Sequence, residues 1–149
     1  MDARITNIHS AQWTEHVRKP GQQPWFELNV SGAHVGVRLE HIPPGEHSSV
    51  HHFHTLEEEH VLVLEGEGTL CWDDGEHVLK AGDHVCFPAG DTHAHHIENR
   101  SLAYCKYLVF GERCAGDVVV YPERRVMYVK ALEGGKGVTY RELPPTTSA

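Results

Sequence analysis

Between Phe26 and Phe110 the chain alternates short apolar-rich runs with turn residues, and this pattern restricts the fold more than any other feature. Turn signals such as Pro43-Pro44-Gly45 and Asp73-Asp74-Gly75 separate the runs. Many short strands joined by Gly, Pro and Asp turns predict an all-β sandwich or barrel. No amphipathic helix pattern stands out before residue 110. The expected strands cover residues 26–30, 35–39, 59–64, 69–72, 77–79, 84–87, 92–98 and 102–110.

The length of 149 residues corresponds to about one domain. Residues 1–25 are mixed and polar, with Trp13 and Trp25 as their large apolar side chains. This segment predicts an extended arm that packs on the domain or on a partner subunit. The barrel is expected over residues 26–130. Residues 131–149 form a C-terminal extension whose Pro-Pro-Thr-Thr-Ser-Ala end is expected to be flexible.

A formal net charge of −8 bears on the possible partners. Because nucleic-acid binding and attraction to an anionic membrane both require a basic surface, neither a nucleic-acid partner nor a membrane partner is expected. The longest aliphatic run, Val61 to Leu64, is far shorter than the ~20 residues that span a bilayer. No signal-peptide pattern is visible at the N-terminus, so a cytoplasmic location is expected. The four cysteines lack C-x-x-C spacing and fit small buried apolar residues.

Histidine is unusually concentrated, with eleven of the 14 histidines between His41 and His96. His52 and His54 are two residues apart, so on a strand they share one face. Glu59 follows five residues later, and a second group begins at His93. Three neutral imidazoles and one carboxylate can bind a divalent transition metal. These residues therefore predict a metal site.

Two longer motifs contain these residues and resemble those of the cupin superfamily. The first is Gly45-x6-His52-x-His54-x4-Glu59-x6-Gly66. The second is Gly82-x5-Pro88-x-Gly90-x4-His95-x3-Asn99. The resemblance is closest to small single-domain bacterial cupins and runs from about residue 32 to about residue 125. It implies a double-stranded β-helix, that is, a jelly-roll barrel, with a metal ion inside.

Carried over residue by residue, the resemblance implies the metal ligands His52, His54, Glu59 and His95. The chain departs from the commonest spacing in both motifs. A spacing of five intervening residues after Gly45 would select His51 as the first ligand. Its motif partner would then be Phe53, which cannot coordinate. In the second motif, a two-residue gap after Gly90 selects His93, whereas the His-x3-Asn spacing selects His95. By strand parity both are expected to point inward, so either is a candidate for the fourth ligand.

Several other polar residues are weaker candidates. Glu57 and Glu58 are expected to be solvated charges beside the barrel mouth, although either replaces Glu59 if the register slips. Asn99 is expected to hydrogen-bond a turn or to support His95. Packing or surface exposure is the favoured interpretation for a further group that could face the cavity: Arg38, His41, Tyr104 and Tyr107. The histidines that alternate away from the ligand face are expected to be surface or sheet-covering residues: His51, His60 and His96.

The favoured function is a metal-dependent enzyme acting on a small organic molecule bound in the barrel. The ion would be Fe, Mn, Zn or Ni, and the resemblance allows oxygenase, isomerase or epimerase, decarboxylase and lyase chemistry. If it is not a ligand, His93 is the candidate general acid or base, because its ordinary pKa lies near neutrality. The alternatives are a non-enzymatic module that binds or senses a small molecule, and a structural metal protein. The resemblance also implies a homodimer.

Overall fold

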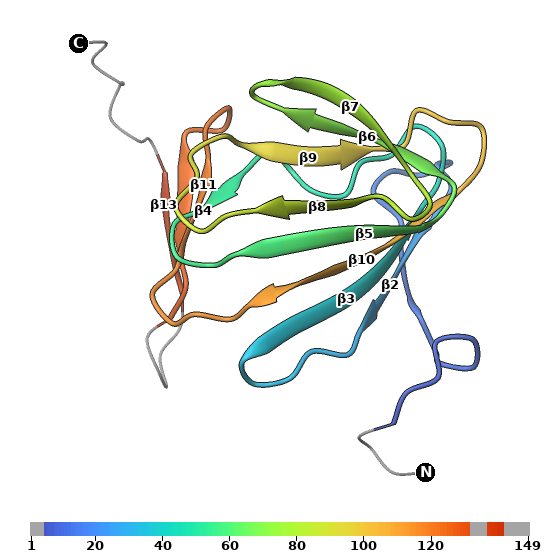
Figure 1. The fold of residues 1–149 in the computed structure, drawn as a ribbon, viewed down its shortest axis with the longest axis horizontal. Coiled ribbons are helices and arrows are strands. Elements are labelled where there is room, and N and C mark those ends of the chain that lie inside the picture. The colour runs from blue at the N-terminus through green and yellow to red at the C-terminus, as the bar shows by residue number, and fades with distance from the viewer. Residues whose placement is uncertain (1–4, 132–136, 142–149) are drawn as a thin grey trace.

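The computed structural model describes residues 5–131 and 137–141, which form strands joined by turns and contain no helix (Figure 1). The expectation of an all-β protein is therefore confirmed. No segment of the described chain is a helix long and apolar enough to cross a membrane. The strands are β1 (Thr14–His16), β2 (Trp25–Asn29), β3 (Val35–Ile42), β4 (Phe53–His54), β5 (Glu59–Glu65), β6 (Glu67–Trp72), β7 (Gly75–Lys80), β8 (His84–Phe87), β9 (His95–Glu98), β10 (Cys105–Glu112), β11 (Val118–Tyr121), β12 (Val126–Val129) and β13 (Val138–Arg141).

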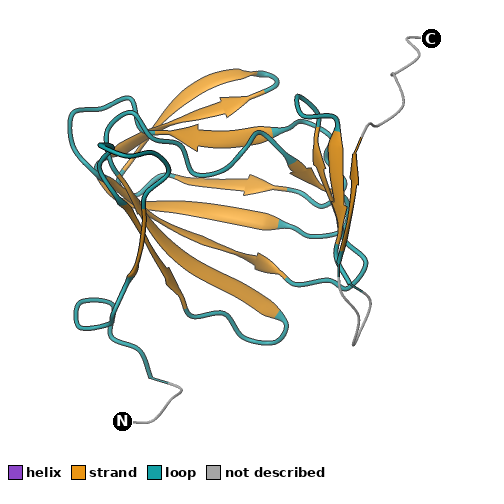
Figure 2. Cartoon of the chain, turned by 180° about the vertical axis from the view of Figure 1, so that it is seen from behind, coloured by secondary structure: helices purple, strands orange, loops and turns teal. Residues whose placement is uncertain are grey.

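These strands form three antiparallel sheets wrapped around one interior. The largest has the order β1-β2-β3-β10-β5-β8, and the others are β7-β6-β9 and β13-β12-β11-β4. In Figure 1 the largest sheet runs across the view, the β7-β6-β9 sheet lies above it, and the β13-β12-β11-β4 sheet stands at the left end. Figure 2 shows the same arrangement from behind, with loops joining the sheets at both ends. This is the jelly-roll architecture of a double-stranded β-helix.

The interior is filled by alternate residues of facing strands, as the period of two requires. Val61 and Val63 point inward from β5 and are almost fully buried. Leu70 and Ile97 lie opposite each other on β6 and β9 and belong to the same cluster. The rest of this core comes from β3, β8 and β10: Ile42, Phe87, Cys105 and Tyr107.

The expected strands agree with the structure best where the apolar pattern is strongest. Residues 84–87 form β8 as expected, and β3 continues to Ile42 because its last residues pair with the start of β10. β9 begins only at His95, so the expected strand over residues 92–98 is too long at its start. The short strands β1 and β11 to β13 were not expected, and the strand expected to carry His52 and His54 consists only of the two residues of β4.

Both terminal segments contribute strands to the sheets. β1 lies within residues 1–25 and pairs with β2 through Thr14 and Glu27. β13 lies within residues 131–149 and pairs with β12 through Val138 and Val129. The final segment expected to be flexible, residues 144–149, falls outside the described residues.

Candidate metal centre

The four residues expected as ligands come from three neighbouring segments. His52 precedes β4 and exchanges two backbone hydrogen bonds with His95, the first residue of β9. His54 ends β4, and Glu59 begins β5 after a short loop. The backbone pairing of residues 52 and 95, which are 43 positions apart, brings the two sequence motifs side by side.

Hydrogen bonds at Nδ1 fix the orientation of two of the rings. His54 Nδ1 lies 2.7 Å from Asp117 Oδ2, and His52 Nδ1 lies 2.7 Å from the carbonyl oxygen of Val50. Both partners accept hydrogen bonds, so Nδ1 carries the proton in each neutral ring and Nε2 keeps its lone pair. This tautomer leaves Nε2 of each ring available for a metal ion.

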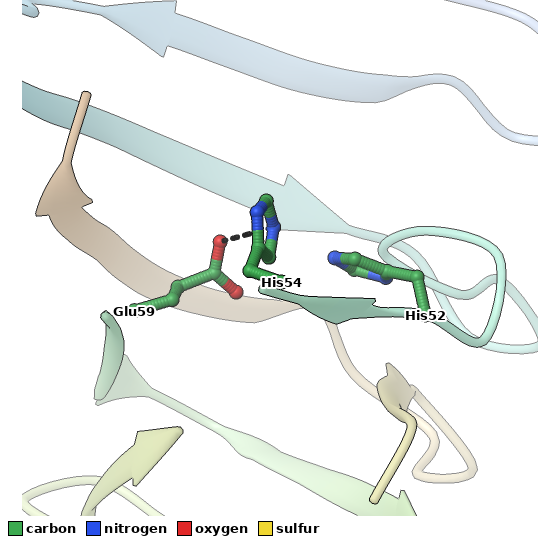
Figure 3. Close-up of side chains that lie close together, drawn as sticks. All are labelled: His52, His54 and Glu59. Atoms are coloured by element: carbon green, nitrogen blue, oxygen red, sulfur yellow. Dashed lines mark ion pairs between the residues drawn. The ribbon is translucent and has the colours of Figure 1, made fainter. Parts of the chain in front are cut away.

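The donor atoms converge on one small space. Candidate ligand atoms of His52, His54 and Glu59 all lie within 4.8 Å of one another. Figure 3 shows the Glu59 carboxylate and the His52 ring extending toward His54 from opposite sides. His54 Nε2 is 4.0 Å from Glu59 Oε2, and His95 Nε2 is 3.5 Å from Glu59 Oε1.

The His95 ring lacks the hydrogen bonds that a buried imidazole normally makes. Only 4% of the residue is exposed, and both ring nitrogens are buried without a hydrogen-bond partner. Phe87 stacks on the ring with centroids 3.5 Å apart and an interplanar angle of 2°. Unsatisfied buried nitrogens are costly. A cation bonded to Nε2 would satisfy one of them, so this donor set fits a divalent transition metal.

The electrostatics of the cluster also suit a cation. Burial alone would raise the pKa of Glu59, but His95, His52 and His54 surround its carboxylate and lower the pKa to about 2. Burial lowers the pKa of His52 to about 4, although Glu59 opposes this shift. At neutral pH the residues therefore present an anionic carboxylate beside a neutral imidazole, the protonation states that metal binding needs.

The shifted pKa of His52 predicts acid lability of the metal-free protein. The pKa falls from 6.5 in the unfolded chain to about 4 in the folded one, so the unfolded state binds more protons between these values. Stability is full above pH 6.5 and declines as the pH falls toward 4. The free energy of unfolding of the metal-free wild type, measured in urea, is expected to fall by about 2 kcal/mol between pH 7 and pH 5. In His52→Gln this part of the pH dependence should disappear. An unchanged slope of the unfolding free energy against pH would contradict its assignment to His52.

Asp117 holds His54 in place and was not singled out in the sequence. It is fully buried, and its Oδ1 accepts hydrogen bonds from the Thr55 and Leu56 amides while its Oδ2 accepts from His54. Burial opposes its ionisation, but the hydrogen bonds from His54 and Leu56 lower its pKa below the ordinary value. The Lys130 ammonium, 3.3 Å from Oδ2, balances its charge. Asp117 lies 63 positions from His54, so no local pattern indicates the contact.

Glu57 is a correction to the expectation of a solvated charge. Only 6% of the residue is exposed. Its carboxylate accepts a hydrogen bond from the Cys114 amide and forms an ion pair with Lys130. Lys130, the residue after β12, is far from Glu57 in the sequence, so no local pattern indicates this ion pair. Glu58, with 45% of its side chain exposed, agrees with the expectation.

Asp117→Asn is expected to weaken metal binding by about 10- to 100-fold without unfolding the protein. The amide can still accept from the Thr55 and Leu56 amides, but its NH2 group would face His54 Nδ1. That ring would then carry its proton on Nε2, the atom needed for coordination. Competition with a chelator measures the affinity, and Glu15→Gln on the exposed face of β1 is the charge-matched control. Equal affinities for both variants would exclude this positioning role.

His93 lies apart from the main cluster of donor atoms. It precedes β9, so strand parity does not orient it, and 47% of its side chain is exposed. Its Nδ1 is 2.6 Å from Asp91 Oδ1, and this hydrogen bond raises the pKa of His93. The ring borders a small pocket that is also lined by His54, Glu59 and His95. The structure thus brings His95, rather than His93, into contact with Glu59 and His52.

A cavity of about 460 Å³ opens beside the cluster. Its wall includes all four expected ligands and, from β3 and β10, Arg38, Glu40 and Tyr107. Arg38 and Tyr107 therefore face the cavity, whereas His41 and Tyr104 pack against each other with ring centroids 4.4 Å apart and do not line it. Asn99 is fully buried and hydrogen-bonds the turn through the Ile42 and Ala103 carbonyls.

Three polar side chains of this wall are linked by one hydrogen bond and one ion pair. The Tyr107 hydroxyl donates to Glu40 Oε2, and Arg38 Nε lies 2.6 Å from Glu40 Oε1. Glu40 and Tyr107 are at most 1% exposed. Burial raises the pKa of the Glu40 carboxyl, although Arg38 and the Tyr107 hydroxyl oppose the shift. Sequence alternation placed Arg38 and Tyr107 on strands, but Glu40 lies just beyond the expected strand 35–39, and nothing in the sequence indicated these contacts.

A family model described as the cupin domain matches residues 38–111. This span contains both motifs and all four expected ligands. The chain belongs to the cupin superfamily. The double-stranded β-helix and the small single-domain cupin expected from the motifs are thereby confirmed.

Two solved structures are similar to this cupin over almost its whole length. One is described as a sugar phosphate isomerase of the cupin superfamily from Silicibacter pomeroyi, with a TM-score of 0.79 and 28% identity over 93% of this chain and 96% of that one. The other is a putative sugar phosphate isomerase from Acidithiobacillus ferrooxidans, with a TM-score of 0.76 and 29% identity over 93% and 92%.

More distant cupins share the barrel alone. A predicted oxalate decarboxylase from Thermotoga maritima has a TM-score of 0.62 and 19% identity over 74% of this chain and 99% of that one. At such identity the likeness shows the fold only. No curated protein matches the sequence.

Proposed function

We propose that this cupin binds one divalent transition-metal ion, Fe, Mn, Zn or Ni, through His52, His54, Glu59 and His95. The observation that carries the proposal is the buried His95 ring without hydrogen-bond partners, set beside two imidazoles whose Nε2 atoms are left free. Four protein ligands leave one or two positions open in a five- or six-coordinate site. A structural zinc site would instead be closed by its four ligands.

We propose further that the protein isomerises a small phosphorylated sugar. Both structures that match 93% of this chain are described as sugar phosphate isomerases or putative ones. The cavity of about 460 Å³ has the size of small-molecule sites. When bound, the metal ion would supply a Lewis acid that polarises a substrate carbonyl or hydroxyl oxygen.

The reaction also needs a group that moves a proton between neighbouring carbons, and we assign this role to Glu40. It lies in the cavity wall, and burial raises its pKa toward the range useful for proton transfer near neutral pH. Tyr107 and Arg38 hold its two oxygens. Isomerisation of an aldose to a ketose is redox-neutral, so no further reactant is required.

His93 remains the competing prediction for this proton transfer. Its side chain is nearly half exposed and is absent from the wall of the larger cavity. Glu40→Gln is therefore expected to abolish turnover while metal content stays unchanged, and His93→Gln is expected to leave turnover within about threefold of wild type. The reverse result would assign the role to His93.

Arg113 is the candidate contact for the substrate phosphate. It lies in the cavity wall after β10 and is exposed; among the described residues its guanidinium donates one hydrogen bond, to the Gly32 carbonyl. The other two cations of the wall, Arg38 and Lys130, already pair with carboxylates. Arg113→Ala is expected to raise KM for a phosphorylated substrate about tenfold or more with little change in kcat. Arg124→Ala, outside the cavity, is the control, and an equal KM in both variants would exclude the contact.

The function is tested by following aldose and ketose phosphates with the metal-loaded protein in deuterated water by proton NMR. Interconversion with deuterium uptake at the carbon next to the carbonyl is expected for wild type and not for His54→Ala. The same sugars without phosphate are expected to react more slowly. Saturable binding without conversion would favour a binding or sensing module. Loss of the fold on metal removal, without ligand binding, would favour a structural metal protein.

We also propose that two copies pair through the N-terminal strand. β1 is the edge of the largest sheet, and an unpaired edge is a template for another strand. Val17, just after it, is an exposed apolar residue. Light scattering after gel filtration is expected to give twice the chain mass; a monomer would contradict the proposal.

A further inference from the structure

A second group of metal-binding side chains lies on the outer face of the β7-β6-β9 sheet. Leu70 and Ile97 face each other across β6 and β9 and point into the core. Cys71 and His96, the next pair along, therefore project from the opposite face. Glu98 follows on the same face because side chains alternate along a strand.

The donor atoms of this group are close together. Ligand atoms of Cys71, His96 and Glu98 all lie within 4.8 Å of one another. His96 Nε2 is 3.0 Å from Glu98 Oε1. Cys71 is a free thiol with 9% of its surface exposed. A thiol, an imidazole and a carboxylate are the three ligand types of protein zinc sites.

Unsatisfied imidazole nitrogens provide a second, independent observation. His96 Nδ1 is buried without a hydrogen-bond partner. The neighbouring His51 ring, with its centroid 5.1 Å from that of His96, has a buried Nε2 in the same condition. Asp73 Oδ1 lies 3.4 Å from this Nε2 without hydrogen-bond geometry, whereas Nδ1 of the same ring is hydrogen-bonded to Glu123 Oε1. Sequence parity predicted only surface or sheet-covering roles for these histidines.

We propose that Cys71, His96 and Glu98 bind a second divalent cation of the zinc type, with His51 as the fourth ligand within reach. The thiol proton leaves to solvent when the sulfur coordinates, so a thiolate and a carboxylate together balance the charge of the ion. Because His51 precedes His52, an ion here would tie the segment that carries a ligand of the first site to β9. The second site is structural in type and independent of the proposed reaction.

The Arg100 guanidinium contacts this group and must be accommodated. Its Nε lies 2.7 Å from Glu98 Oε2, and its Nη2 lies 3.5 Å from Cys71 Sγ. Glu98 Oε1 is hydrogen-bonded to His96 Nε2 instead, so the ion would replace that hydrogen bond while Oε2 keeps Arg100. Arg100 is about half exposed and also pairs with Glu76 through two hydrogen bonds, so only the weak contact to sulfur is lost.

A second cysteine group offers a built-in comparison. Ligand atoms of Glu58, His60 and Cys86 also lie within 4.8 Å of one another. Both nitrogens of His60 are already hydrogen-bonded, one to His84 and one to Glu58. This ring has no unsatisfied nitrogen to offer, so the group around Cys86 is expected to stay empty.

Cobalt titration of the full chain tests the proposal, because a cobalt–thiolate bond gives a near-ultraviolet charge-transfer band that nitrogen and oxygen ligands do not. The band is expected in wild type, His54→Ala and Cys86→Ser, and is expected to be lost in Cys71→Ser. Native mass spectrometry should count two zinc ions in wild type and one each in His54→Ala and Cys71→Ser.

His96→Gln provides a second variant in case Cys71→Ser does not fold, and circular dichroism of the metal-free proteins checks folding. In His96→Gln, the cobalt affinity obtained from titration of this band is expected to fall at least tenfold. Absence of the band in wild type, or its persistence in a folded Cys71→Ser protein, would overturn the proposal. Loss of the band in Cys86→Ser would also overturn it, by moving the site to the other group.

Discussion

His54→Ala is expected to lower the metal content of the purified protein by one equivalent and to abolish turnover. The substitution removes the Nε2 atom that faces Glu59 and leaves Asp117 without its imidazole partner. Loss of a residue that only supports a ligand costs about 10- to 100-fold in affinity, so loss of the ligand itself is expected to cost more. Elemental analysis after dialysis against metal-free buffer measures the content.

His77→Ala is the matched control for this experiment. His77 is an exposed histidine of β7 that does not line the cavity, so its removal tests for unspecific binding to the many histidines. It is expected to keep the wild-type metal content. Full content in a folded His54→Ala protein would contradict the proposed ligand set.

Phe87→Ala is expected to destabilise the metal-free protein by about 3–5 kcal/mol. Phe87 is 4% exposed, belongs to the core, and meets Trp72 edge-on with centroids 5.6 Å apart. Its removal leaves a cavity under the stacked His95 ring. We therefore expect the metal affinity to fall as well, because His95 is no longer held in one orientation. Urea unfolding and chelator competition measure the two effects.

Phe87→Leu distinguishes the role of Phe87 in core packing from its role in orienting the His95 ring. Leucine fills much of the lost volume, so the stability loss is expected to be smaller, below about 2 kcal/mol. It cannot stack on an imidazole, so metal affinity should fall in both variants. If the free energy of unfolding of Phe87→Ala is within about 1 kcal/mol of the wild-type value, this part of the core is not well packed around His95.

The longer strands were predictable because the two-residue alternation of apolar and polar side chains is a local signal. Residues 84–87 match β8, and the turns after Glu65 and Trp72 fall where glycine occurs. The short strands β4 and β11 carry little such signal, since β4 has only two residues. Their pairing, Val119 with His54, depends on contacts between distant parts of the chain. Sequence periodicity does not report such contacts.

The metal-ligand candidates were predictable where the signal is local, and were not predictable where it depends on residues distant in the sequence. Two-residue spacing was enough to place His52 and His54 together, and the cluster of Figure 3 contains them with Glu59. His93 and His95 could not be separated by spacing, because the start of β9 decides which of them is oriented by a strand. Asp117 and Glu40 were missed for a similar reason. Each acts through a partner more than 60 positions away, namely His54 for Asp117 and Tyr107 for Glu40.

Anomalous X-ray diffraction from crystals of the metal-loaded protein tests the central claim most directly, because it locates the ion and its ligands together. The proposed centre predicts one peak inside the barrel, roughly 2.0–2.2 Å from Nε2 of three histidines and from a Glu59 oxygen. The three histidines would be His52, His54 and His95. A fully loaded crystal without a peak there, or with the ion held by His93 in place of His95, would contradict the proposed centre.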